Sequence, residues 1–229
     1  MLVVGLDGAR GGWIAAYAEV GAGSRARVVD VHFTPDVSSA LTSDLAVAAI
    51  DMPIGLPEVG PRTCDREART LLRPHGSRVF AAPIRATLAH RDDYAAACAT
   101  ARAVSGRALS KQAWNLLPKI AEVDSLADDE RIHECHPEVS FALMAGAAVS
   151  ARKKSPDGAA QRRDLLRRAF DLGAAWTPPR LAGAPDDILD ALACAWSAVR
   201  IASAHGLTLG LVDGVTPRDA LGRPMRICA

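Results

Sequence analysis

The chain has 229 residues, of which 49% are hydrophobic and 23% charged, as is usual for a globular protein large enough to bury a core. A formal net charge of +1 excludes a polycation that coats nucleic acid indiscriminately. No apolar run approaches the roughly 18 residues of a membrane span. The first predicted strand starts at Leu2, without room for a signal peptide, so we expect a cytoplasmic protein with no membrane partner.

Cysteine usage and charge distribution further restrict the kind of protein that the sequence can encode. The five cysteines are widely scattered and include no CxxC pair, which predicts small core residues rather than disulfides or structural zinc. Residues 62–91 and 151–180 are rich in basic side chains, and residues 122–138 are rich in acids. This pattern predicts an acidic centre between basic flanks, although solvated helix faces produce it too.

The first fifty residues predict a meander followed by a crossover. Apolar segments at 2–7, 13–20 and 26–33, joined by the glycine turns GARGG and GAGSR, are typical of three antiparallel strands. Thr34-Pro35 supplies a helix start and predicts a short helix to about Ser43. The apolar segment LAVAAID at 45–51 is the fourth strand, and a right-handed crossover would place it parallel to the first.

The remaining pattern is mostly helical. It predicts a helical insertion at about 58–129 within a single domain of residues 1–229, then a short strand in RIHECHPE at 131–138. Helices are expected in PEVSFALMAG and AAQRRDLLRRAFDLG, followed by a long last helix from Pro185 to about His205. LTLGLVD and PMRICA predict a final strand or hairpin.

Asp7 and Asp51 each end a wholly apolar strand. If the two strands are parallel neighbours, both carboxylates emerge at the edge where open α/β sheets bind ligands. Two acids there repel each other unless a cation lies between them, and Mg²⁺ prefers such oxygen ligands. The alternative is that Asp7 only begins a tight Asp-Gly turn.

The last helix adds two acids that share one face. Asp187 and Asp190 are three residues apart, whereas Asp186 suits the N-cap position. Asp187 could instead serve only the helix dipole, an explanation that suits Asp190 in the second turn less well. In HECH, Glu134 is a candidate metal ligand or supporting group, and His136 is equally a structural or a catalytic candidate. Zinc is not favoured, because HECH lacks the helical spacing of HExxH.

Lysine is rare in this arginine-rich chain, and three of the four lysines fall in two segments. Lys119 lies in LLPKIAEVD, and Lys153 and Lys154 lie in SARKKSPDG. These lysines could bind phosphate beside a metal site. Lys119 and Glu122 could equally form an ordinary pair on a helix surface.

Eight blocks in chain order carry a resemblance: GLDGARGGW, AIDMPIGLP, RTCDREAR, SRVFAAPIR, LLPKIAEVD, HECHPEVSF, KKSPDG and PDDILDALACAWSA. From about residue 3 to residue 204 the chain resembles the uncharacterised family of predicted RNase H-like nucleases, domain of unknown function family 429. The resemblance implies an α/β protein with a mixed five-stranded sheet, an antiparallel meander plus parallel strands, helices on both faces and an insertion after strand four. The distribution of acids also resembles the Holliday-junction resolvase branch of that superfamily.

The resemblance implies a nuclease that uses two Mg²⁺ or Mn²⁺ ions on a nucleic acid whose type is not indicated. Asp7, Asp51, Asp187 and Asp190 would hold the metal, and Glu134 would assist. Lys119, Lys153 or Lys154 would bind phosphate.

Two other functions are compatible with these features. A non-catalytic module that binds nucleic acid or protein could keep the fold, although retaining clustered carboxylates without a metal is costly. An ATP-dependent phosphotransferase of the actin and sugar-kinase group is disfavoured, because the chain is too short for a duplicated fold and lacks a second Asp-x-Gly turn.

Overall fold

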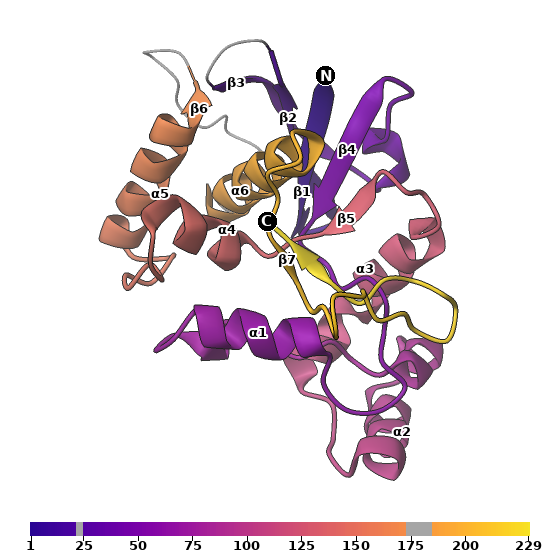
Figure 1. The fold of residues 1–229 in the computed structure, drawn as a ribbon. Helices are drawn as coiled ribbons and strands as arrows, with labels where there is room; N and C mark the ends of the chain where they lie inside the picture. The colour runs from indigo at the N-terminus through magenta and orange to yellow at the C-terminus, as the bar shows by residue number, and fades with distance from the viewer. Residues whose placement is uncertain (22–24, 173–184) are drawn as a thin grey trace.

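The computed structural model describes residues 1–21, 25–172 and 185–229. Its centre is a mixed sheet with helices on both faces (Figure 1). The strand order is β5-β4-β1-β2-β3-β6. The strands are β1 (Leu2–Ala9), β2 (Gly12–Glu19), β3 (Ala26–Thr34), β4 (Leu45–Ile50), β5 (Ile132–Glu134) and β6 (Phe170–Asp171).

The strand directions confirm the predicted RNase H-like fold. β1, β2 and β3 form an antiparallel meander, β4 lies parallel to β1, and β5 lies parallel to β4. The five predicted strands are therefore present. A sixth, the two-residue β6, adds a short parallel pairing to β3 that the sequence pattern did not indicate. Of the predicted turn at 21–25, residues 22–24 lie outside the described residues.

Six α-helices lie in the described part of the chain. They are α1 (Thr63–Leu71), α2 (Tyr94–Ser105), α3 (Lys111–Leu126), α4 (Pro137–Ala145), α5 (Pro156–Ala169) and α6 (Pro185–Ala202). Three short 3-10 segments are η1 (Ser38–Ala40), η2 (Gly76–Arg78) and η3 (Arg85–His90). In the ranges described, none of the helices is both long and apolar enough to cross a bilayer.

The predicted helix from Thr34 to about Ser43 is wrong, because only the single turn η1 forms there. The Asp36 carboxylate accepts hydrogen bonds from Ser38 Oγ (2.7 Å) and Ser39 N (2.8 Å). This side chain therefore satisfies the local backbone in a turn, which competes with continuation of a helix.

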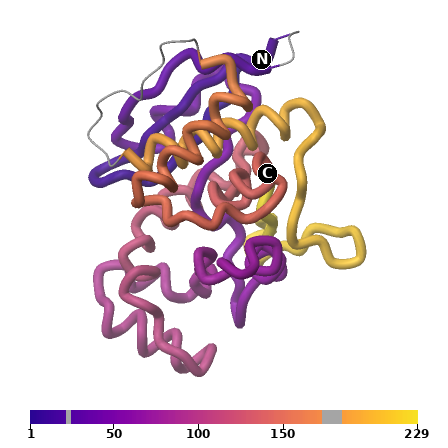
Figure 2. The backbone as a smooth tube through the Cα atoms, turned by 90° about the vertical axis from the view of Figure 1, so that its left-hand side faces the viewer, coloured from indigo at the N-terminus to yellow at the C-terminus, as the bar shows by residue number. Residues whose placement is uncertain are grey.

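The C-terminal segment forms the predicted hairpin. β7 (Thr208–Leu209) and β8 (Ile227–Cys228) pair antiparallel and pack with α1 in a small third apolar cluster. The chain between the two strands projects from the body of the molecule (Figure 2, yellow). All five cysteines are buried and none forms a disulfide, as predicted.

Alternation along the strands divides the main core into two layers. Val3 of β1 joins the cluster that includes α6, whereas Val4 and Leu6 join the cluster that includes α3. Because successive side chains of a strand point to opposite faces, Gly5 and Asp7 lie on the same face as Val3, toward α6.

Gly5 sets the distance between β1 and α6. A Cβ atom at this position would lie 2.0 Å from Ala195 N and 2.2 Å from Ala191 O, both backbone atoms of α6. The helix therefore lies directly against the strand backbone at this point, and the close contact leaves no room for any side chain at residue 5.

We predict that Gly5→Ala lowers the free energy of unfolding by about 3 kcal/mol or more, because the backbone of α6 cannot move aside as a side chain can. Chemical denaturation of both proteins measures the difference. Gly206→Ala is the matched control, because its added Cβ would meet only Ile201, with Cγ1 nearest at 3.2 Å. Equal stability of the Gly5 variant and the wild type would contradict the prediction.

Candidate active site

Asp7 and Asp51 lie together at the carboxyl end of β1 and β4. The two strands are parallel, and Asp51 N donates a hydrogen bond to Leu6 O (2.9 Å). The charge of Asp51 contributes to raising the pKa of Asp7, which indicates that the two carboxyl groups lie close together. The predicted juxtaposition of the two acids is therefore present in the structure.

Helix α6 brings further carboxylates to the same place. Asp190 is 4% exposed and Asp7 is 7% exposed, while Asp187 is partly buried one turn nearer the helix start. Burial, followed by the charge of Asp190, raises the pKa of Asp7 far above its usual range. Burial also raises the pKa of Asp51. Asp186 lies within the first turn of α6 and not at the predicted N-cap, a position that falls outside the described residues.

Lys153 supplies the positive charge closest to these acids. Its Nζ donates to Asp190 Oδ2 (2.7 Å) and lies 3.6 Å from Asp186 Oδ2. Burial raises the pKa of Asp190 to about 7, although the Lys153 ammonium acts in the opposite direction. The Lys153 side chain is still 39% exposed, so it lies between the buried carboxylates and solvent. Lys154 is exposed beside it.

Lys119, on α3, is a second lysine near Asp7. Its ammonium donates to Gly12 O and lies 4.3 Å from the centre of the Trp13 ring, and its stem passes over Gly8, which has no side chain to obstruct it. Burial lowers the pKa of Lys119, while nearby acids including Asp7 oppose this effect. Lys119 is thus held at the β1–β2 turn, close enough to Asp7 to influence it electrostatically.

Glu122 does not pair with Lys119 on the helix surface. Its carboxylate accepts hydrogen bonds from Trp13 Nε1 (3.0 Å) and from Val37 N (2.7 Å). The alternative that Lys119 and Glu122 form a pair on the helix surface is therefore wrong. Lys119 binds the backbone at Gly12, next to the β1–β2 turn, and Glu122 binds Trp13 and the residue before η1.

Glu134 lies next to the cluster but has a different set of contacts. Its two oxygens accept hydrogen bonds from Arg62 Nη1 and Nη2 (both 2.6 Å), and Oε2 also accepts from Ile54 N (2.6 Å). Arg62 in turn pairs with Asp65, whose other oxygen accepts from Ala82 N (3.1 Å). These contacts give Glu134 a structural partner and bind the β4–α1 connection to β5.

Sequence reasoning missed Arg62 and Asp65. Both are almost fully buried, and removing either partner of such a network leaves a buried charge uncompensated. The only sequence signal is their i, i+3 spacing at the start of α1, which many exposed helix pairs share.

His136 faces the cluster from the start of α4. Its positive charge would lower the pKa of Asp51, and its Nδ1 atom is buried without a hydrogen-bond partner. Within residues 1–21, 25–172 and 185–229, no group of three or more His, Cys, Asp or Glu side chains is already arranged to hold one metal ion.

The donor chemistry nevertheless fits a hard divalent cation. Burial raises the pKa values of Asp7, Asp51 and Asp190, neighbouring carboxylates add to this effect at Asp7 and Asp190, and Lys153 Nζ is hydrogen-bonded to Asp190. Carboxylate oxygens are the ligands that Mg²⁺ and Mn²⁺ prefer. In the arrangement observed, Lys153 partly fulfils the role that such a cation would take.

The uneven charge of the sequence is largely resolved within the fold. Arginines of the basic flanks pair with acids of the central segment: Arg78 and Arg162 with Glu138, and Arg85 with Asp124. Asp124 also pairs with Arg223 from the C-terminal segment. These ion pairs neutralise much of the predicted acidic centre. The acids around Asp7 are instead brought together by the carboxyl ends of β1 and β4 and by the first turns of α6.

Residues 5–215 match the family model described as "Protein of unknown function (DUF429)". The chain belongs to this family. No curated protein matches the chain.

Solved structures similar to this DUF429 chain include two of RuvC from Thermus thermophilus. One is described as the RuvC structure, with 12% identity, a TM-score of 0.42, and coverage of 90% of this chain and 98% of the other. The second is RuvC in complex with a Holliday junction substrate, with 11% identity, a TM-score of 0.41, and coverage of 90% and 95%. Such values do not support any inference about activity.

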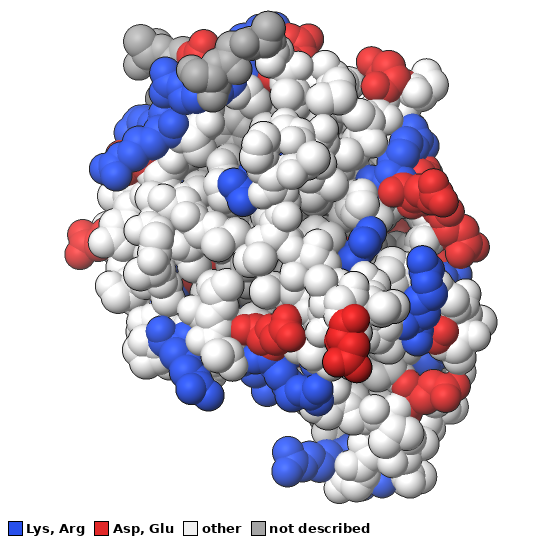
Figure 3. All heavy atoms as spheres, in the orientation of Figure 1, with Lys and Arg blue, Asp and Glu red and all other residues white. Residues whose placement is uncertain are grey.

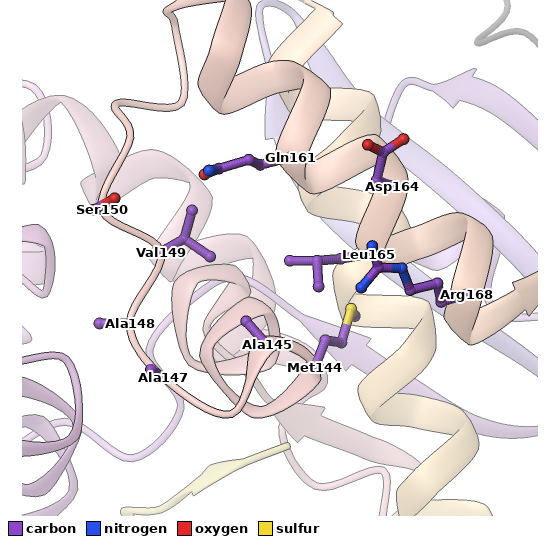
Figure 4. Close-up of a pocket in the computed structure, with 10 residues that line it drawn as sticks. All are labelled: Met144, Ala145, Ala147, Ala148, Val149, Ser150, Gln161, Asp164, Leu165 and Arg168. Atoms are coloured by element: carbon purple, nitrogen blue, oxygen red, sulfur yellow. The ribbon is translucent and has the colours of Figure 1, made fainter.

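Two cavities lie near α5 of this DUF429 protein. One of about 380 Å³, between the end of α4 and α5, is lined by Met144, Val149 and Leu165 among others, and none of the predicted site residues borders it (Figure 4). Another of about 300 Å³ is bordered by Lys153, Lys154, Arg163 and Asp186, and so opens beside the carboxylates. The second cavity is the one placed to admit an anionic group.

We predict that the metal-free protein loses stability as pH rises from about 4 to about 7. Unfolded Asp ionises near pH 4, whereas the raised pKa values of Asp7, Asp51 and Asp190 keep protons bound in the folded state. The folded state then binds more protons than the unfolded state, so the free energy of unfolding falls with pH in that interval.

Asp7→Asn tests this directly, because it removes one of the mutually repelling charges. In EDTA at about pH 8 we expect the variant to exceed wild type by about 1 kcal/mol or more, or roughly 2–4 °C in Tm, with a smaller difference near pH 5. Asp164→Asn, on the exposed side of α5, should show neither effect. A variant less stable than wild type at the higher pH would refute the explanation.

Proposed function

We propose that this DUF429 protein is a Mg²⁺- or Mn²⁺-dependent nuclease that hydrolyses phosphodiester bonds. The observation that carries the proposal is the convergence of Asp7, Asp51 and Asp190 from three different elements, where Asp7 and Asp190 are buried, Asp51 is partly buried, and Lys153 Nζ is hydrogen-bonded to Asp190. An excess of buried carboxylate is unfavourable unless a cation or protons balance it.

Asp7, Asp51, Asp187 and Asp190 are the proposed metal-holding residues. When bound, the divalent ions would activate water and stabilise the leaving oxygen of an in-line displacement. Besides the larger effect of burial, the charges of Asp190, Asp51 and Asp187 all raise the pKa of Asp7. Glu134 contributes by fixing Arg62 and the backbone at Ile54, which positions the segment that follows Asp51.

The lysines have separate proposed tasks. Lys153 holds Asp190 in the cation-free arrangement and, once released from it, can donate to a substrate phosphate at the cavity it borders together with Lys154. Lys119 orients the β1–β2 turn through Gly12 O and adds positive charge near Asp7, where the phosphate of a substrate would lie.

We expect Asp7→Asn to lower Mn²⁺-dependent cleavage by at least about a thousandfold, because it removes a ligand worth several kcal/mol in the transition state. The assay screens labelled DNA, RNA, hybrid and branched substrates with Mn²⁺, with circular dichroism confirming the fold. Cleavage by the variant at the wild-type rate would remove Asp7 from the mechanism. Cleavage of none of the substrates by wild type would favour a non-catalytic binding module.

We further expect Mg²⁺ or Mn²⁺ to raise the Tm of the wild-type protein, since a ligand at about 100 times its Kd stabilises by about 2.7 kcal/mol. Asp187→Asn/Asp190→Asn should abolish this shift while Asp164→Asn retains it. Differential scanning fluorimetry with and without the ion measures both. An unchanged wild-type Tm would count against a metal site irrespective of activity.

A further inference from the structure

A long groove crosses the helical insertion, away from the second cavity at α5. It has a volume of about 860 Å³, within the range of about 300–1,000 Å³ typical of ligand sites. One wall is the 79–84 segment that follows η2, and the other comprises the end of α2, the 107–110 loop and the start of α3. The helical segment between β4 and β5 thus builds a cavity larger than either of the two beside α5.

Two of the residues that line the groove are basic, and most of the others are apolar. Arg69 and Arg107 line it, and none of its lining residues is acidic. Arg69 Nε donates to Val79 O (2.9 Å), which anchors that guanidinium at the wall. In the orientation of Figure 1 the surface is indented below α1 and beside α2, with Lys or Arg side chains on both sides (Figure 3). This charge suits an anionic partner.

One wall of the groove is shared with the carboxylate site. Val79 and Phe80 line the groove and also border the small cavity that contains Asp51 and His136. The segment is fixed in place by Ala82 N, which donates to Asp65, and so by the Arg62 and Glu134 network. Phe80 therefore borders both the groove and the small cavity at Asp51.

We propose that this groove binds an unpaired segment of a DNA strand. Phe80 stacks on a base, and Arg69 and Arg107 contact phosphates. The inference rests on the proposed nuclease function, for which it supplies the path of the strand to the carboxylates. The mainly apolar lining favours deoxyribose over ribose, whose 2′-hydroxyl is a hydrogen-bonding group that such a lining would leave unpaired.

Binding of a labelled oligo(dT) of about 15 nucleotides, measured by fluorescence anisotropy in EDTA, tests the proposal. Phe80→Ala should weaken binding by about tenfold or more, and Phe80→Tyr, which keeps an aromatic face, should retain it. Arg107→Gln should weaken binding and reduce the salt dependence by about one phosphate contact. Arg102→Gln is the matched control: it is also exposed, on the same helix–loop segment, but does not line the groove.

Several results would overturn the proposal. They are failure of oligo(dT) to bind, equal affinity of all Phe80 variants, and an equal effect of Arg102→Gln and Arg107→Gln. Equal or tighter binding of oligo(U) would overturn the assignment to DNA. If no oligonucleotide binds, the proposal is wrong, and an apolar peptide or a second copy of the chain would be the occupant to test next.

Binding in EDTA and cleavage with Mn²⁺ test the groove and the nuclease separately. If binding depends on Phe80 but no substrate is cleaved with Mn²⁺, the nuclease proposal is refuted and the groove proposal is supported. Mn²⁺-dependent cleavage that needs Asp7, together with binding that ignores Phe80, would refute the groove and leave the nuclease standing.

Discussion

The direct contact between Gly5 and the backbone of α6 is the constraint on which the site depends. A side chain at residue 5 would collide with Ala191 and Ala195, so the helix lies as close to β1 as backbone atoms permit. Asp7 lies two residues beyond Gly5 on the same face of the strand, and Asp190 directly precedes Ala191 on the helix. The contact that completes the core therefore also brings together carboxylates from opposite ends of the chain.

This proximity has an electrostatic consequence. Burial is the largest cause of the raised pKa values of Asp7, Asp51 and Asp190. The charge of Asp51 adds to this effect at Asp7 and at Asp190, and the charge of Asp190 adds to it at Asp7. Lys153 relieves part of the imbalance through its hydrogen bond to Asp190. The Lys153 ammonium is hydrogen-bonded to Asp190, where the proposed cation would bind. Such a cation would therefore have to displace Lys153 from Asp190.

A second buried network supports the surroundings of the site. Arg62 joins Glu134 of β5 to Asp65 of α1, and Asp65 holds the backbone of the 79–84 segment at Ala82. Such a network tolerates the loss of neither partner, because each remaining charge would be buried without compensation. It therefore fixes the 79–84 segment, which borders both the groove and the small cavity at Asp51, and links the helices between β4 and β5 to the central sheet.

Local pattern determined much of this protein. Apolar runs and glycine turns predicted the meander and the parallel β4, runs that end in acids pointed to Asp7 and Asp51, and capping signals and helical spacing predicted the last helix and pointed to Asp190. The sequence did not indicate the two-residue β6, and a capping signal at Thr34-Pro35 wrongly predicted a helix where Asp36 forms a turn. Only the tertiary structure decided that Glu134 binds Arg62, that Lys153 binds Asp190, and that Phe80 lies between groove and site. Periodicity reports which face of an element is buried, whereas the partner of a buried charge depends on long-range packing that no local pattern encodes.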